Sequence, residues 1–218
     1  MSTKLDVEIY YKNSNSEINS YGFPEPLRCL IVGASGSGKT TLMLNFIFKD
    51  WIKFNRVIIY STTLHQKTYQ DLAQAQAKLN EQNKGFFKGW SKVGPIQKPF
   101  IEFYGEVKPI EEVEGDDILV VFDDLVLEKQ KEIGKYFVVG RHRGFHCLFL
   151  SQNYGKVARQ TIKSNLNYLF LFKQPHFYLK QIHEDFKADT SFTSFTEECE
   201  TEWKVGGAEQ HNFAKFLL

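Results

Sequence analysis

The segment at residues 33–40 contains residue types that can bind a phosphate chain. It reads Gly-Ala-Ser-Gly-Ser-Gly-Lys-Thr and matches the pattern G-x-x-x-x-G-K-[ST]. A mostly apolar run precedes it at residues 28–32, and a second apolar segment follows at 40–51. Glycines let successive backbone N–H groups converge on phosphate oxygens, and the N-terminus of a following helix favours negative charge. The pattern therefore predicts a phosphate-binding loop between a buried strand and a buried helix.

Two residues of this loop have separate predicted roles. Lys39 would reach the β- and γ-phosphates of ATP, and the Thr40 hydroxyl would bind Mg²⁺, a cation that prefers oxygen ligands. The other residues that we expect to bind the nucleotide are Gly33, Ala34, Ser35, Gly36, Ser37, Gly38 and Thr41. ATP and Mg²⁺ are therefore the expected substrate and cofactor.

Two adjacent acids follow another apolar run, at residues 118–122. A buried strand that ends in acids places carboxylates at the carboxyl edge of a parallel sheet, where ligands bind in open α/β folds. We expect Asp123 to hold Mg²⁺ through its water shell and Asp124 to polarise the attacking water. The alternative is a strand that merely ends at a polar loop.

A block of basic residues and glycines occupies residues 140–146, Gly-Arg-His-Arg-Gly-Phe-His. An apolar run follows it at 147–151, and Gln152 comes next. Phosphoryl transfer leaves charge on the γ-phosphate that a cationic side chain can stabilise, and an amide can sense that phosphate or position water. Arg141 and Arg143 are the candidates for the cation, and Gln152 is the candidate for the amide.

Metal clusters and disulfides are disfavoured. His142 and His146 have the i,i+4 spacing of metal ligands on a helix, but Gly144 lies between them and a buried strand follows. An odd number of widely spaced cysteines without a C-x-x-C pair argues against a disulfide framework or a zinc site. These are Cys29, Cys147 and Cys199.

Apolar runs alternate with helical patterns along the chain. Strands are expected at residues 28–32, 56–60, 100–104, 118–122, 147–151 and 168–172, and helices at 40–51, 65–82, 126–139 and 157–163. This alternation predicts an α/β fold with a mostly parallel sheet covered on both faces. The remaining expected elements are a short strand at 6–11, and a helix and edge strands after Pro175, with 201–205 and 212–218 as candidates. The expected division is an N-terminal extension at 1–26 and one domain at 27–218.

Composition narrows the class of protein. The chain has 27 Lys and Arg against 26 Asp and Glu, which gives a net charge of +1 and excludes a polycationic coat. Apolar stretches of about five residues are far shorter than the roughly 20 that a membrane-spanning helix needs. The first residues have no apolar secretory signal. An intracellular protein without membrane association is therefore expected.

The ordered combination of these blocks resembles the FtsK–HerA superfamily of P-loop ATPases, and within it the genome-packaging ATPases of double-jelly-roll DNA viruses, the poxvirus-like and polinton-like group. The resemblance covers about residues 27–173 and includes Gly140-Arg141-x-x-Gly144-x-His146, Gln152 and Ile162-Lys163-Ser164-Asn165. It implies a three-layer RecA-like core, a homo-oligomeric ring and ATP hydrolysis between subunits. It also favours Arg141 as the cation supplied to a neighbouring subunit, in which case Arg143 would orient a loop.

The function that the resemblance implies is translocation of double-stranded DNA, driven by ATP hydrolysis, to package a viral genome into a preformed capsid. DNA, capsid proteins and further copies of the chain are the expected partners, and the infected host cell or the virion is the expected location.

The alternative is a P-loop nucleotide or nucleoside kinase, but the sequence has neither an Arg-rich lid nor a lid with paired cysteines. Asp124 and Gln152 argue against a module in which ATP acts only as an assembly switch. A GTPase is disfavoured because residues 83–86, Asn-Lys-Gly-Phe, lack the Asp of the N-K-x-D element.

A lysine-rich stretch at residues 83–98 is expected to form an exposed loop. Lysines bind phosphates without reading sequence, and aromatic rings can stack on bases, so the stretch has the composition of a nucleic-acid contact. A solvated loop with a few anchoring aromatic residues is an equally open interpretation. The residues concerned are Lys84, Lys88, Lys92, Lys98, Phe86, Phe87 and Trp90.

Overall fold

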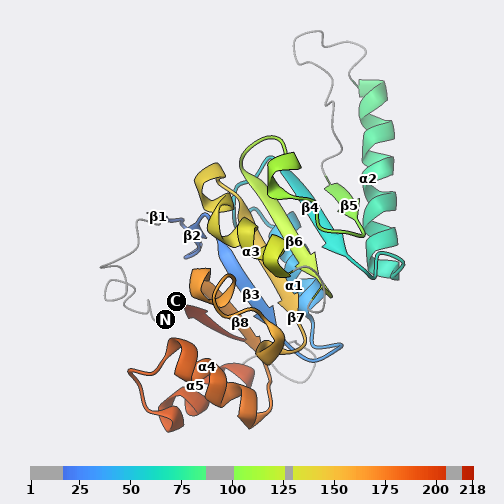
Figure 1. Ribbon diagram of the computed structural model, residues 1–218. Helices are drawn as coiled ribbons and strands as arrows, with labels where there is room; N and C mark the ends of the chain where they lie inside the picture. Colours follow the sequence, from blue (N-terminus) through green and yellow to red (C-terminus); the bar gives the residue numbers. More distant parts are fainter. Residues whose placement is uncertain (1–16, 87–100, 126–129, 205–212) are drawn as a thin grey trace.

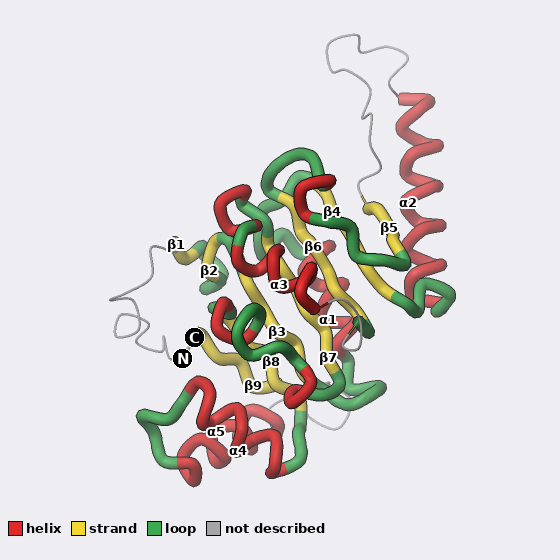
Figure 2. The backbone as a smooth tube through the Cα atoms, in the orientation of Figure 1, coloured by secondary structure: helices red, strands yellow, loops and turns green. Residues whose placement is uncertain are grey.

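The computed structural model describes residues 17–86, 101–125, 130–204 and 213–218. Its centre is a seven-stranded sheet with the order β5-β4-β6-β7-β3-β8-β9, drawn in yellow in Figure 2. The antiparallel edge strand is β9 (Phe213–Leu217), which pairs with β8. All other strands of the sheet are parallel: β3 (Arg28–Val32), β4 (Arg56–Ser61), β5 (Ile101–Tyr104), β6 (Ile118–Asp123), β7 (His146–Ser151) and β8 (Tyr168–Phe172).

Helices cover both faces of this sheet. They are α1 (Lys39–Phe48), α2 (Lys67–Phe86), α3 (Gln130–Val138), α4 (His176–Phe186) and α5 (Phe192–Lys204). Side chains alternate between the faces along each strand. Ile31 of β3 packs in the same apolar cluster as Met43 of α1, whereas its neighbour Val32 packs in a second cluster with Phe137 of α3. Figure 1 shows α3 in front of the sheet and α1 behind it, which makes the three-layer α/β arrangement that the sequence predicts.

The remaining elements lie at the margins of the sheet. A two-stranded ribbon, β1 (Glu17–Ile18) with β2 (Pro24–Glu25), precedes β3. At the other end of the chain α4 and α5 lie side by side below β8 and β9 in Figure 1, and the Trp203 indole of α5 donates a hydrogen bond to Leu171 O at 2.8 Å. No helix in the described part of the chain has the length and apolar character that a membrane crossing requires.

The prediction of a helix at residues 157–163 is wrong. In its place the chain forms turns between two short 3₁₀ helices, η5 (Tyr154–Lys156) and η6 (Lys163–Asn165). The Gln130 side chain of α3 accepts from Ala158 N and donates to Lys156 O, which holds this segment against α3. Lys163 N and Ser164 N donate to carbonyls five residues back, at Ala158 and Arg159, rather than four residues back as in an α-helix. Lys163 is drawn instead to Asp185 of α4, with Nζ 3.5 Å from Oδ2. Tertiary contacts therefore outweigh the local helical pattern here.

Other boundaries differ from the prediction or are not covered. Helix α2 continues to Phe86, so residues 83–86 are helical rather than part of a loop, and the rest of the lysine-rich stretch lies outside the described residues. Residues 201–204, in one of the two segments left open between helix and strand, belong to α5, whose apolar face packs against β9 through Phe195 and Phe216. The other open segment, 212–218, contains the edge strand β9. The strand expected at 6–11 and the first four residues of the helix expected at 126–139 also lie outside the described part.

Candidate active site

The phosphate loop joins β3 to α1 at the carboxyl edge of the sheet. Gly33 N donates a hydrogen bond of 3.1 Å to Ser151 O, the last residue of β7, and thereby ties the start of the loop to the sheet. Gly38 precedes α1 with a φ of 100°, in the left-handed region that glycine adopts without steric cost. Residues 34–36 at the tip of the loop are exposed. The loop is therefore fixed at its base and open to a ligand at its tip.

Gly33 lies where a larger residue does not fit. A Cβ atom there would be 2.8 Å from Phe172 Cβ and 2.3 Å from Ser37 Oγ. We expect Gly33→Ala to lower the free energy of unfolding by about 1–3 kcal/mol, the usual cost of overpacking, and to weaken ATP binding because the loop must shift. Thermal unfolding and ATP titration measure both effects. Gly105→Ala is the matched control, since a Cβ at Gly105 meets no atom within 4 Å, and equal behaviour of the two variants would contradict the prediction.

The Lys39 side chain closes the loop on itself. Its Nζ donates hydrogen bonds of 2.8 Å to both Gly33 O and Ala34 O, and the residue is only 9% exposed. Burial lowers the pKa of Lys39, while the carboxylates of Asp123 and Asp124 act in the opposite direction and favour the ammonium. The ammonium is therefore held between the loop and the two acids, the position from which it can bind terminal phosphates.

Asp123 is the last residue of β6 and is 9% exposed. Its strand pairs with β4 on one side and β7 on the other, so the carboxylate emerges in the middle of the carboxyl edge, with Ser61 of β4 beside it. Burial raises the pKa of Asp123, whereas the Tyr69 hydroxyl and the Lys39 ammonium stabilise the ionised form. The site thus holds a shielded carboxylate with a cation and a hydrogen-bond donor near it.

Asp124 differs from Asp123 in both exposure and backbone conformation. Its side chain is exposed, and its φ of 57° lies in the left-handed region, which is uncommon for residues other than glycine. The Thr62 hydroxyl donates to Asp124 O at 3.2 Å and supports this turn. Two neighbouring carboxylates therefore have different environments, one buried and one accessible to water.

Tyr69 belongs to the site although the sequence gives no motif that marks it. It lies in the first turn of α2, is 2% exposed, and its hydroxyl donates a hydrogen bond to Asp123 Oδ2. Burial raises the pKa of Tyr69, and the charge of Asp123 raises it further, so the phenol stays protonated and remains a donor. The local signal is that Tyr69 and Leu72 form a buried i,i+3 pair on a helix rich in Gln, Lys and Ala.

The other predicted site residues lie at the same edge. Thr40 is half-buried in the first turn of α1, and Thr41 beside it is exposed. Gln152 is exposed and directly follows Ser151, the residue that binds Gly33 N. Strand β7 lies between β6 and β3, so Gln152 leaves the sheet between the strand of the paired acids and the strand of the phosphate loop. The fold therefore brings the predicted loop, acids and amide to one edge.

The donor groups at this edge fit a nucleoside triphosphate with a hard cation. Ser37 Oγ in the phosphate loop is buried and has no hydrogen-bond partner among the described residues. The Thr40 hydroxyl and the Asp123 carboxylate are oxygen donors of the kind that Mg²⁺ prefers. The loop has no acidic side chain that would repel phosphate. Besides Lys39, its polar side chains are hydroxyls, and its backbone amides can also donate to phosphate oxygens.

The predicted Gly140 to His146 block lies at the amino ends of the parallel strands, whereas the phosphate loop lies at their carboxyl ends. The short helix η4 (Gly140–Arg143) precedes the amino end of β7, and the strands between the two edges are about 16 Å long for five residues. The Arg143 guanidinium donates to Ile110 O at 3.2 Å, Val113 O at 2.5 Å and Gly115 O at 2.6 Å. These bonds hold Arg143 against the loop before β6 of the same chain.

Arg141 is exposed and makes no comparable set of bonds. Its Nε lies 3.2 Å from His142 Nε2. Burial lowers the pKa of Arg28 at the amino end of β3, and the charge of the nearby Arg141 lowers it further. Arg141 therefore lies at the far edge from the phosphate loop of the same chain. Of the two predicted arginines, it is the one available to another molecule.

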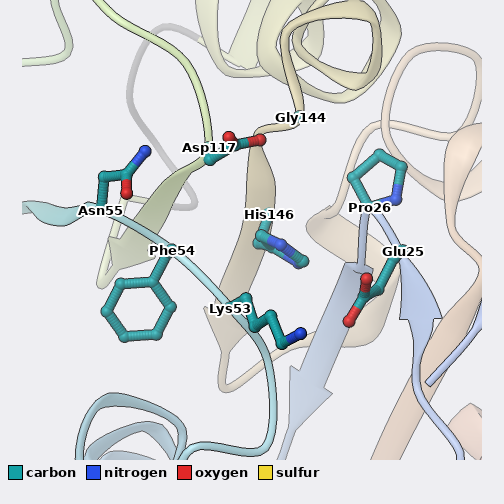
Figure 3. Close-up of a pocket in the computed structure, with 8 residues that line it drawn as sticks. All are labelled: Glu25, Pro26, Lys53, Phe54, Asn55, Asp117, Gly144 and His146. Carbon is teal, nitrogen blue, oxygen red and sulfur yellow. The ribbon is translucent and has the colours of Figure 1, made fainter.

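His146 has a structural position at this far edge. Its Nδ1 accepts a hydrogen bond of 3.1 Å from Leu27 N, and it is 4% exposed. The ring lies in the wall of a pocket of about 440 Å³, which Figure 3 shows with Glu25, Lys53 and Asp117 around it. Burial lowers the pKa of His146, although the two carboxylates and a hydrogen bond with the Lys53 backbone favour protonation. The neutral ring thus joins the segment before β3 to the start of β7.

The lowered pKa of His146 predicts a loss of stability in acid. The unfolded chain, with a pKa of 6.5, takes up a proton before the folded chain does, so the free energy of unfolding falls as pH drops below about 6.5. His146→Asn should reduce this slope, because an amide oxygen can accept from Leu27 N without titrating. Thermal unfolding between pH 8 and pH 5 measures it. The exposed His142→Asn is the control, and an equal slope in wild type and His146→Asn would contradict the prediction.

The parallel sheet, the phosphate loop and the paired acids define a P-loop ATPase. The family model described as Poxvirus A32 protein matches residues 20–182. The chain belongs to this family. A search of curated proteins finds no match.

Solved structures similar to this chain include the genome packaging NTPase B204 from Sulfolobus turreted icosahedral virus 2. Its complex with ATP-gammaS has a TM-score of 0.52 at 12% identity, covering 88% of this chain and 92% of that chain. Its complex with sulfate has a TM-score of 0.51 at 11% identity, covering 78% and 86%. At this identity the likeness shows the fold. The fold agrees with the predicted RecA-like core, and the family match confirms the ATPase class and the predicted resemblance to the poxvirus-like group.

Proposed function

We propose that this ATPase translocates double-stranded DNA and packages a viral genome into a preformed capsid. One observation carries the proposal: each chain presents its phosphate loop and paired acids at one edge of the sheet and the exposed Arg141 at the other. A site divided in this way is completed by a second copy, which favours a closed ring of identical subunits. A ring with ATP sites between subunits suits the threading of a long polymer.

The described residues have distinct roles in hydrolysis. Lys39 exchanges its two carbonyl acceptors for oxygens of the β- and γ-phosphates, and the loop amides bind the same chain. Asp124, the exposed acid, orients the attacking water and accepts its proton, while the Gln152 amide senses the γ-phosphate. Arg141 of the neighbouring copy stabilises charge on the transferred phosphoryl group. Thr40 and Asp123 would hold Mg²⁺, which neutralises phosphate charge when bound.

The net charge of +1 is compatible with a threading role. A protein that coats or wraps DNA needs a basic surface, whereas a ring needs positive charge only on the few segments that face its pore, repeated by symmetry. Lys88, Lys92 and Lys98 remain a prediction for such a segment, because they lie outside the described residues.

The proposed partners and location follow from the family and the fold. Viral DNA, capsid proteins and further copies of the chain are the partners, and packaging takes place in the infected cell, in the cytoplasm or nucleus, or in association with the virion. The virus packaging NTPase B204, which has a similar fold, supports a viral assembly role.

Steady-state ATP hydrolysis with and without long double-stranded DNA tests this function. We expect DNA to stimulate turnover and the stimulation to fall steeply as salt rises, because phosphate contacts release counterions. Lys39→Ala is the control for hydrolysis that does not belong to this site. Turnover that is insensitive to DNA would contradict the motor function. Transfer of the γ-phosphate to an added nucleoside or nucleotide would instead support the kinase alternative.

A further inference from the structure

Helix α2 is joined to the sheet at two places along its described length. Near its start, the Tyr69 ring is buried, 6.4 Å from the Phe103 ring of β5 between centroids. Two turns later the Gln76 amide takes both backbone groups of Ile101, donating to its O at 2.9 Å and accepting from its N at 2.5 Å. The C-terminal end of α2 extends past the sheet, as Figure 1 shows on the right. These contacts hold the first half of α2 against β5.

The Tyr69 hydroxyl reaches the end of β6 rather than solvent. It donates to Asp123 Oδ2, and Ser61 of β4, aligned with Asp123 and 1% exposed, lies beside it. Ser61 is itself held, because its Oγ accepts from Thr63 N at 3.1 Å. One carboxylate oxygen of Asp123 is thus occupied by a donor on a buried ring, so the orientation of this carboxylate depends on a residue of α2.

We infer that Tyr69 is the positioning residue for Asp123 and couples the magnesium–nucleotide site to helix α2. The inference rests on the proposed role of Asp123 as a magnesium residue. Groups that bind a direct metal ligand from behind fix its orientation, and their removal commonly costs 10- to 100-fold in metal affinity. The lower end of this range is expected for Asp123, which holds Mg²⁺ through water. A carboxylate held by α2 keeps its orientation only while α2 keeps its place. Conversely, a cation that orders Asp123 strengthens the attachment of α2.

Tyr69→Phe tests the inference, because it removes the hydroxyl and retains the buried ring. We expect a fluorescent non-hydrolysable ATP analogue to bind this variant about 10-fold more weakly than wild type in Mg²⁺ and equally well in EDTA. Tyr136→Phe is the matched control: it also deletes a buried hydroxyl, bonded to Tyr60 OH at 3.0 Å and to Lys108 O at 2.8 Å, but on the α3 face. It should bind like wild type in both buffers. Equal affinity of Tyr69→Phe and wild type in Mg²⁺, or an equal loss in both buffers, would overturn the inference.

Amide hydrogen exchange of the wild-type chain supplies a readout that does not depend on the variant folding. The analogue with Mg²⁺ should slow exchange at residues 69–76 several-fold more than the analogue with EDTA. No difference between the two buffers at these amides would overturn the coupling.

Failure of the proposed role of Asp123 gives a different pattern. In that case Asp123→Ala shows the same Mg²⁺ dependence of analogue binding as wild type, because the Thr40 hydroxyl and the phosphates still hold the cation. If wild type requires Mg²⁺ and Asp123→Ala loses that requirement while Tyr69→Phe keeps it, only the role of Tyr69 fails.

Discussion

Asp124→Asn is expected to bind ATP with nearly wild-type affinity and to hydrolyse it about 10²- to 10⁴-fold more slowly. The variant keeps the size of the side chain but removes the carboxylate that accepts a proton from water, and general-base catalysis contributes about this factor. Asn also tolerates the left-handed φ of 57° at this position, so the turn after β6 is retained. Equilibrium binding of ATP and steady-state phosphate release, measured on the same preparation, separate the two effects.

Lys39→Ala provides the opposite pattern and serves as the comparison. Its ammonium is buried between the loop and both acids, so its removal takes away the main cation for the phosphates. Binding itself should weaken, and hydrolysis should fall with it. If Asp124→Asn and Lys39→Ala lose affinity to the same extent, the separate roles assigned to the acid and the lysine are incorrect.

Arg141→Ala is expected to reduce hydrolysis by about 10³-fold or more without preventing ATP binding, the effect seen when an arginine supplied to the γ-phosphate is removed. Arg141 and the phosphate loop lie at opposite edges of the sheet, so the arginine can act only on a neighbouring copy. Mixing Arg141→Ala with Lys39→Ala subunits should therefore restore part of the activity. At a mixed interface, an intact loop from the first variant meets an intact arginine from the second.

Arg143→Ala is the control for this experiment. Its guanidinium binds three backbone carbonyls of its own chain and lies 4.6 Å from the Phe145 ring, so its loss should lower the melting temperature. It should show no recovery on mixing beyond the activity of its own folded subunits. An absence of recovery for Arg141→Ala at every mixing ratio would exclude action on a neighbouring subunit.

The sequence by itself determined the strands, the phosphate loop and the paired acids. Each of these depends on local rules: a run of apolar residues forms a buried strand, glycines permit the loop, and acids end the strand at the ligand-binding edge. For the same reason the expected elements at residues 56–60, 118–122 and 168–172 agree with the observed strands. Parallel pairing then brings Asp123 and Gln152 to the edge where Lys39 begins α1.

Only the tertiary structure decided which residues surround these motifs. Tyr69 has no sequence signature, because its role depends on where α2 places a phenol relative to Asp123, 54 positions away. The two arginines of one short block have different environments for a similar reason. The carbonyls that bind Arg143 come from the loop before β6, and Arg141 is left exposed.

Tertiary contacts also explain why the predicted helix at residues 157–163 does not form. Its residues have adequate local propensity for a helix, but the Gln130 side chain binds their backbone and Asp185 attracts Lys163. Local patterns determine a segment when its neighbours agree with them. Where partners distant in sequence compete for the same backbone groups and charges, only the folded arrangement decides the outcome.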